Sequence, residues 1–238
     1  MIKEENLTLP PNPFNGWHFD KAELKKEIIY EQEFEELLKF IDTKPKFFSD
    51  AKGKRRNMYY TWLKDAFSLA LFCGGRRQEI PEIKWTDIIA NRKTGNIKGG
   101  VLKLRDIKVS KIQNLSQVKI KPIEINQDLY DLLMRMGYEK NKGLDKYLID
   151  PDENCSREII KNCLSRSFAY YISFVKTGGR KLEFKCLRKT WFTSCAAAVG
   201  TDMASFMGGH SDSEVTTNHY FNDLELAGAS GKFEKIFQ

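Results

Sequence analysis

The most constraining feature of the sequence is the segment 58–73, whose apolar side chains cover almost every side of the helix that it would form. A helix without a polar face has to be surrounded by other elements of the fold. Gly74 and Gly75 follow the segment, and glycine is typical of the position after a helix. The sequence therefore predicts a central buried helix, built around Leu63, Ala66, Phe67, Ala70 and Leu71.

Other helices are indicated by one-sided apolar stripes and by capping residues. In the segments 31–42 and 127–136, apolar residues recur at the three- and four-residue spacing of an amphipathic helix. Asn126 and Ser156 are residue types that cap the amino termini of helices. Helices are expected over 31–42, 58–73, 127–136, 156–177 and 185–199.

Between residues 85 and 126 the apolar period shortens to that of strands, and turn-forming residues interrupt it. Three short strands are expected at 87–90, 101–108 and 118–125. The predicted fold is therefore mainly α with a small three-stranded antiparallel sheet, an α+β domain.

Charge is distributed unevenly along the chain. The whole sequence has 39 Lys and Arg against 32 Asp and Glu. Residues 1–43 carry a net charge of −5, and residues 44–238 carry a net charge of +12. A partner rich in phosphate would fit this balance, and we expect it to bind beyond residue 44.

Cysteine, histidine and apolar runs argue against several classes of protein. Five cysteines without a C-x-x-C pair and only three histidines argue against a disulfide scaffold and a zinc site, and fit a reducing cytosol. The longest apolar run, at about residues 67–73, is too short to span a bilayer. No secretory signal opens the chain, so we expect a cytoplasmic protein that is not embedded in a membrane.

Charged residues gather in three places. Arg76 follows the double glycine, and Glu79 lies three residues on, close enough to hold its guanidinium. Lys185 and Arg188, also three apart, share one face of a predicted helix. Taken alone, Arg76 with Glu79 could be a basic turn with a local salt bridge, and Lys185 with Arg188 could be a solvated helix face. Lysines on strand edges often serve only to prevent aggregation. The lysines on the predicted strands and their turn are Lys108, Lys111, Lys119 and Lys121.

The segment 200–220 contains a turn and a capping box. A short helix is expected to end at Gly208-Gly209, which puts His210 in a turn. Residues 211–214 have the S-x-x-E spacing of a capping box, so a new helix starts there and carries Tyr220 near its end. A histidine between two helix ends is well placed to bind an anion, although a lone turn histidine is usually polar surface.

The order of these patterns along residues 28–220 resembles the tyrosine recombinase (phage integrase) family, and the resemblance implies the catalytic-domain fold of that family. The first family box is matched by Gly74, Arg76, Glu79, Ile80, Ile83, Trp85 and Asp87. The second box, followed by a Gly-His turn and the tyrosine, is matched by Lys185, Arg188, Gly209, His210 and Tyr220.

The resemblance implies a site-specific recombinase or integrase that cleaves and rejoins double-stranded DNA without a metal or a cofactor. Tyr220 would attack a backbone phosphate, form a 3′-phosphotyrosine and expel a 5′-hydroxyl. Arg76 and Arg188 would bind the non-bridging oxygens, because paired guanidinium donors match phosphate geometry. His210 would donate a third hydrogen bond to the same oxygens.

The remaining site residues have supporting roles in this interpretation. Lys111 in the strand turn would be the general acid that protonates the leaving oxygen, with Lys108 as the reserve choice. Lys185 stands where most members have histidine, and it would bind phosphate or help Tyr220 to ionise. Glu79 would hold Arg76.

The resemblance also predicts a domain organisation. Residues 1–20, with three prolines, are expected to be a linker or arm, 21–220 the catalytic domain, and 221–238 a tail that docks on a neighbouring protomer. The family's amino-terminal core-binding domain is expected to be absent, and protomers are expected to form a tetramer on the full DNA site. Within the boxes, Gly75 and Gly208 replace bulky apolar residues, and one extra residue separates the histidine from the tyrosine.

Three other functions stay open. A relative that binds DNA but has lost strand cleavage would explain Lys185, and a covalent protein–DNA adduct would exclude it. A type IB topoisomerase shares the fold and the tyrosine chemistry, and would relax supercoils without strand exchange. An RNA-binding or scaffold protein would explain the charge but not the ordered motifs.

Overall fold

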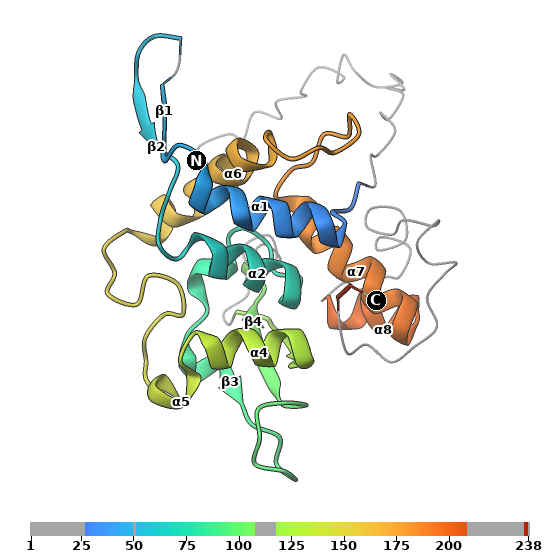
Figure 1. Cartoon of the computed structure of the whole chain (residues 1–238). Helices are drawn as coiled ribbons and strands as arrows, with labels where there is room; N and C mark the ends of the chain where they lie inside the picture. The colour runs from blue at the N-terminus through green and yellow to red at the C-terminus, as the bar shows by residue number, and fades with distance from the viewer. Residues whose placement is uncertain (1–26, 50, 108–117, 209–235, 238) are drawn as a thin grey trace, which may run out of the picture.

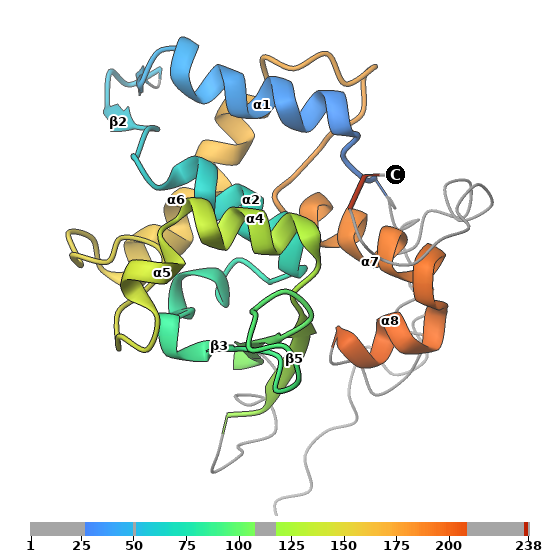
Figure 2. The same cartoon turned by 60° about the horizontal axis from the view of Figure 1, so that its bottom comes forward.

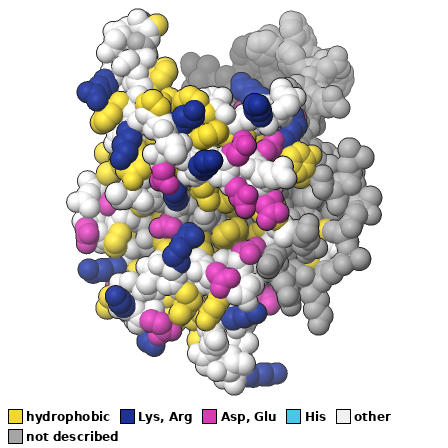
Figure 3. All heavy atoms as spheres, in the orientation of Figure 1, with side chains coloured by type: hydrophobic (Ala, Val, Ile, Leu, Met, Phe, Trp, Pro, Cys, Tyr) yellow, Lys and Arg dark blue, Asp and Glu magenta, His cyan; other side chains and the backbone are white. Residues whose placement is uncertain are grey.

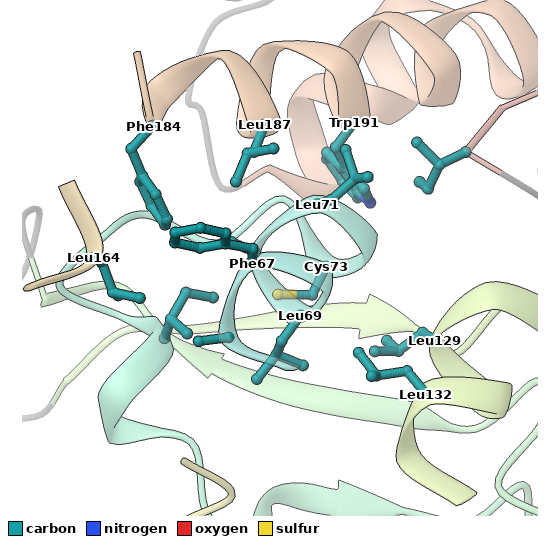
Figure 4. Close-up of a cluster of buried hydrophobic side chains, with 14 of the residues drawn as sticks. Phe67, Leu69, Leu71, Cys73, Leu129, Leu132, Leu164, Phe184, Leu187 and Trp191 are labelled. Carbon is teal, nitrogen blue, oxygen red and sulfur yellow. The ribbon is translucent and has the colours of Figure 1, made fainter. Parts of the chain in front are cut away.

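Helix α2 (Leu63–Cys73) lies at the centre of the fold, as the sequence predicts. In the computed structural model, which describes residues 27–49, 51–107, 118–208 and 236–237, helices α1, α4, α6 and α7 all contact it (Figure 1). The Phe67 ring meets the rings of Phe168 and Phe184 at centroid distances of 5.5 Å and 6.0 Å. Figure 4 shows Phe67 and Phe184 directed toward each other within this core. The all-round apolar character of the segment is thus explained by burial on every side.

The surrounding helices begin where the sequence offers a cap. The Asn126 side chain accepts a hydrogen bond from the Leu129 amide (3.0 Å), and the Ser156 hydroxyl accepts one from the Ile159 amide (3.3 Å). The helices are α1 (Glu31–Thr43), α4 (Gln127–Arg135), α5 (Tyr138–Asn141), α6 (Arg157–Ile172), α7 (Lys185–Val199) and α8 (Thr201–Met207), with 3₁₀ turns η1 (Ile80–Glu82) and η2 (Trp85–Asp87).

Two helices are shorter than the sequence predicts, because local contacts favour turns at their ends. Helix α2 begins at Leu63 rather than at residue 58. Before it, the Asn57 side chain accepts a hydrogen bond from the amide of Tyr59 (3.0 Å). Helix α6 ends at Ile172 rather than at residue 177, and the Thr177 hydroxyl instead donates to the Arg180 carbonyl (2.8 Å).

The predicted three-stranded antiparallel sheet is confirmed, with the order β3 (Ile88–Ile89), β4 (Val101–Arg105), β5 (Ile120–Glu124). Leu102 pairs with Ile123 and Leu104 with Lys121. These four side chains are all buried on the inner face of the sheet. Helix α8 contacts strand β5 (Figure 2), so the end of α8 lies beside the strand that carries Lys121.

A second sheet was not expected from the sequence. Strands β1 (Phe47–Ser49) and β2 (Arg55–Asn57) form an antiparallel hairpin that stands away from the helices in Figure 1. Its strands lack alternating apolar and polar residues, because neither face is buried, and alternation is the signal by which strands are found. The segment was therefore missed.

The carboxyl end of the chain packs onto its own domain. Ile236 is buried, its amide donates to the Asp128 carboxylate (2.6 Å), and its carbonyl accepts from the Ser194 hydroxyl (2.6 Å). The Phe237 ring lies 6.3 Å from the ring of Phe34. Ile236 and Phe237 therefore pack against their own chain. Docking of the tail on a neighbouring protomer stays a prediction.

Candidate active site

The site begins where α2 ends. Gly74 has a φ of +61°, a left-handed conformation that glycine adopts without strain, and the chain turns there toward Arg76. The Arg76 guanidinium donates to Glu79 (2.8 Å), and the Arg76 amide donates to the same carboxylate (2.8 Å). The ion pair expected from their spacing is therefore present, and Glu79 is buried beneath it.

A second carboxylate and a buried lysine complete this group. Asp106, which directly follows β4, accepts a hydrogen bond from the Arg76 guanidinium (3.0 Å). The Lys121 ammonium lies 2.7 Å from Glu79 and 3.9 Å from Asp106. Lys121 is only 1% exposed, and both carboxylates are buried. We call Arg76, Glu79, Asp106 and Lys121 the buried charge cluster.

Sequence reasoning missed the position of Lys121, which it treated as one of several lysines on the strand surface. The alternation of inward and outward side chains along β5 nevertheless indicates its position. Ile123 is an inward residue of β5, and position 121 has the same parity. Lysine is rarely buried unless it is paired. An inward lysine on a strand therefore indicates an internal ion pair, and the structure identifies Glu79 as its partner.

Charge and burial shift the pKa values within the cluster. Burial alone would raise the pKa of Glu79, but the nearby cations Lys121, Arg188 and Arg76 together hold that pKa below its usual value. Burial lowers the pKa of Lys121 to about 8, although Glu79 opposes the shift. Glu79 therefore stays ionised at neutral pH, whereas Lys121 loses its proton under mildly alkaline conditions.

Arg188 reaches the same region from α7. It is 5% exposed, and its guanidinium donates to the carbonyls of Gly74 and, at 3.1 Å, Gly208. The guanidinium also lies 4.6 Å from the centroid of the Phe192 ring. Arg188 is one of the charges that act on both Glu79 and Lys121. The structure thus brings Arg76 and Arg188 together, and Arg188 is not part of a solvated helix face.

Packing explains the two glycines that depart from the family boxes. A Cβ atom at Gly208 would overlap the ring of Phe192, and one at Gly75 would meet the Ile80 side chain at 2.5 Å. Neighbouring side chains thus fill the space beside both glycines. The glycines preserve the packing of the site rather than leave it open.

Trp85 and Asp87, also matched in the first box, have structural roles. Trp85 is buried in the core. The Asp87 carboxylate accepts two hydrogen bonds from the Arg105 guanidinium, at 2.7 Å and 2.9 Å. This pair ties η2 to strand β4 beside the cluster.

Lys185 lies outside the buried charge cluster. It is the first residue of α7, its side chain is 67% exposed, and its ammonium forms an ion pair with Glu183 (2.9 Å). This pair holds the pKa of Glu183 below its usual value. Lys108, Lys111, His210 and Tyr220 lie outside the described residues.

The described part of the chain offers the chemistry of anion binding. Two guanidinium groups converge at one turn, and their donors match phosphate oxygens. No group of three or more His, Cys, Asp or Glu side chains in the described ranges is arranged to hold a metal ion. None of the described helices is long and apolar enough to cross a bilayer.

Comparison with known proteins supports the fold. No protein-family model and no curated protein sequence matches the chain. A lambda integrase dimer bound to a COC′ core site matches with a TM-score of 0.54 and 17% identity over 86% of this chain and 50% of that one. A lambda integrase tetramer bound to a Holliday junction gives 0.54 and 17% over 86% and 53%.

XerA recombinase matches with a TM-score of 0.51 and 16% identity, over 84% of this chain and 62% of its own length. The chain therefore spans between half and about three-fifths of the length of these relatives. At such low identity the likeness extends to the fold alone. The fold implied by the two motif boxes is confirmed, and the chain has the fold of a tyrosine recombinase catalytic domain.

Proposed function

We propose that the chain is the strand-cleaving part of a site-specific DNA recombinase that works through a 3′-phosphotyrosine. The observation that carries the proposal is the convergence of Arg76 and Arg188 at the Gly74 turn. They come from distant parts of the sequence, and both are buried or half-buried against the same cluster. Two fixed guanidinium groups fit the two non-bridging oxygens of one phosphodiester.

In the proposed reaction, the Tyr220 oxygen attacks phosphorus, and the bond from phosphorus to the 5′-oxygen breaks. The tyrosine proton is lost to a nearby base or water, and Lys111 gives a proton to the leaving oxygen. Arg76, Arg188 and His210 bind the non-bridging oxygens, whose charge grows in the transition state. Removing one such donor typically costs ~10²–10³ in rate. The bond energy is retained in the phosphotyrosine, so the reverse attack rejoins the strand.

Glu79, Asp106 and Lys121 are positioning residues in this proposal. They act through Arg76, whose guanidinium both carboxylates hold. Fixed donors are effective because they need no reorganisation as the charge develops. The cluster supplies that rigidity.

Double-stranded DNA is the proposed partner, and assembly of several protomers on it is the proposed functional state. The lambda integrase structures that match this fold include a dimer on a core site and a tetramer on a Holliday junction. The family interpretation adds docking of residues 221–238 on a neighbouring protomer, and action on host-cell DNA in the cytoplasm. Phage or mobile-element origin belongs to the same proposal.

A DNA-binding relative without cleavage is the alternative that a specific observation favours. Lys185 replaces the family histidine, and it is exposed and paired with Glu183. If Lys185 takes no part in the reaction, one member of the family site is missing. The adduct experiment below separates the two functions, and relaxation of supercoiled plasmid tests the topoisomerase alternative.

The test is capture of a covalent adduct. The protein is incubated with a pool of nicked duplexes of randomised sequence, denatured in detergent, and resolved from free DNA on a gel. The wild type is expected to retain DNA, whereas Tyr220→Phe, which removes only the attacking oxygen, is expected to retain none. Tyr130→Phe on α4 is the matched control and is expected to behave as wild type.

Two results would contradict the proposal. An adduct that persists in Tyr220→Phe would mean that another side chain attacks. Duplex binding by the wild type without any adduct would favour the non-cleaving relative.

A further inference from the structure

The β1–β2 hairpin is a two-stranded ribbon with no third strand in the described part of the chain. Phe47 pairs with Asn57, Phe48 with Arg56 and Ser49 with Arg55. An isolated two-stranded ribbon is marginally stable in water. Figure 1 shows the ribbon projecting from the body of the molecule, and most side chains of its two strands are exposed.

The base of the ribbon is nevertheless fixed in direction. The Tyr170 hydroxyl on α6 donates to the Pro45 carbonyl (3.1 Å), and the Tyr170 ring packs at 6.0 Å from Phe48. The Met58 amide donates to the Lys46 carbonyl (2.8 Å), which closes the ladder. These contacts fix the orientation of the ribbon relative to α6.

The ribbon is strongly basic. Residues 44–57 contain six Lys or Arg and one Asp, a net charge of +5. The Arg55 guanidinium lies 3.9 Å from the centroid of the Phe47 ring, and Phe47 and Phe48 remain 47% and 42% exposed. Figure 3 shows Lys and Arg side chains together with hydrophobic ones around this projection, at the upper left.

We infer that the β1–β2 hairpin is an accessory DNA-binding arm, which inserts into a groove of the duplex beside the cleavage site and contacts its phosphates. A two-stranded ribbon fits the major groove of B-DNA, and clustered Lys and Arg bind phosphates by releasing counterions. A second copy of the same ribbon is a poor partner, because two +5 surfaces repel. The inference rests on the proposed function, since DNA is the proposed substrate.

The position of the hairpin suits this role. It precedes α2 in the chain, and Arg76 follows α2. A helix of 11 residues is about 16 Å long, which equals roughly five base pairs of duplex at ~3.4 Å each. The length of α2 is therefore about half a helical turn of duplex, and the footprinting described below measures how far the hairpin lies from the cleaved phosphate.

The experiment compares two triple variants that remove the same charge. Lys52→Gln, Lys54→Gln and Arg55→Gln lower the net charge of residues 44–57 from +5 to +2. Lys140→Gln, Lys142→Gln and Lys146→Gln neutralise exposed lysines at and beyond α5, and serve as the control. Binding of a fluorescent 30-base-pair duplex is measured by anisotropy across a series of NaCl concentrations, and circular dichroism checks the fold.

The hairpin variant is expected to bind at least about tenfold more weakly in low salt. The slope of log K against log salt should fall in magnitude by roughly 2–3, because each lost phosphate contact contributes ~0.9. The control variant is expected to stay within about twofold of wild type. Hydroxyl-radical footprinting should show protection beside the cleaved phosphate that disappears only in the hairpin variant.

Other outcomes distinguish a failure of the hairpin inference from a failure of the proposed function. If the wild type binds duplex and both variants keep its slope, the arm is excluded while the proposed function stands. If the hairpin variant aggregates with an unchanged slope, the basic residues serve only to protect an open strand edge, and the inference is again overturned. A dimer that forms without DNA and requires the hairpin would indicate a protein partner instead. If the wild type binds no duplex, both proposals fall.

Discussion

Arg76 and Arg188 reach one site by different means. The Arg76 guanidinium is held by two buried carboxylates, Glu79 and Asp106. The Arg188 guanidinium is held by two backbone carbonyls, those of Gly74 and Gly208. Carboxylates titrate and depend on neighbouring charges, whereas carbonyls do neither. The anchoring of Arg76 should therefore respond to pH and to Lys121, while that of Arg188 should depend on where α2 and α8 end.

The largest expected effect comes from removing the guanidinium groups themselves. Arg76→Ala and Arg188→Ala are each expected to lower the rate of adduct formation by ~10²–10³, because each removes donors to the phosphate. Arg188→Ala should also lower the free energy of unfolding, since it leaves two helix-end carbonyls without a buried partner. Single-turnover cleavage and urea unfolding measure the two effects.

The proposed difference in how the two arginines are anchored is contradicted if Arg76→Ala and Arg188→Ala lower the free energy of unfolding equally. Arg76 is less deeply buried than Arg188, and its removal leaves Lys121 to pair with Glu79. Asp106 would lose its 3.0 Å hydrogen bond from Arg76 but keep Lys121 at 3.9 Å, so Arg76→Ala should lower the free energy of unfolding by less than Arg188→Ala does. A large loss of stability in Arg76→Ala would mean that the carboxylates of the buried charge cluster need both Arg76 and Lys121.

Lys121→Met is expected to weaken the anchoring of Arg76 and to leave that of Arg188 unchanged. Removing one partner of a buried ion pair typically costs 3–5 kcal/mol, and the loss here should lie at or below the lower end of that range, because Glu79 loses its buried cation but keeps its ion pair with Arg76. Cleavage should fall by roughly 10²-fold, since a small displacement of a positioned group has that effect. Equilibrium unfolding in urea gives the free energy, and single-turnover kinetics gives the rate.

The double variant Lys121→Met with Glu79→Gln provides the control. Replacing both charges removes the uncompensated carboxylate, so part of the lost stability should return. Cleavage should stay low, because Arg76 has lost its main carboxylate. Recovery of both properties together would show that Lys121 and Glu79 matter only for folding.

The third prediction concerns pH. Lys121 has a pKa of about 8 in the folded protein, below its usual 10.5. Between these values the unfolded chain binds more protons, so the contribution of Lys121 to stability rises with pH in this window. Cleavage should fall over the same window, because Glu79 loses its ammonium partner and holds Arg76 less firmly.

A matched variant isolates this titration. The other groups that act on Lys121 from neighbouring elements are Glu79, Arg76 and Arg188, with Asp106 nearby, and burial keeps the Cys73 thiol protonated with a pKa of about 12. Lys121→Arg keeps a charge that does not titrate, so its pH–rate profile should lack the fall above pH 8. A profile identical to that of wild type would assign the fall to another group.

Much of the fold follows from the sequence, because its signals are local. The caps at Asn126 and Ser156, the end of α2 at Gly74 and the pair of Arg76 with Glu79 each depend on residues a few positions apart. Strand alternation also indicates that Lys121 points inward, but its pairing with Glu79, the place of Asp106 and the ring of Phe192 at Gly208 could not be predicted in this way. Each depends on a contact between elements distant in sequence, and only the packed fold brings those elements together.

The smallest expected effect lies at Lys185, the other cation of the second box. Its exposed pair with Glu183 is worth about 0–1 kcal/mol, so Lys185→Ala should leave unfolding almost unchanged. Cleavage should fall by roughly fivefold, the equivalent of about 1 kcal/mol in the barrier, and Lys185→His should retain much of the activity. Glu183→Gln, which frees the ammonium without removing it, should not lower cleavage. If Lys185→Ala cleaves as well as wild type, Lys185 is a solvated charge, and the site consists of the buried arginines, their cluster and the residues beyond Gly208.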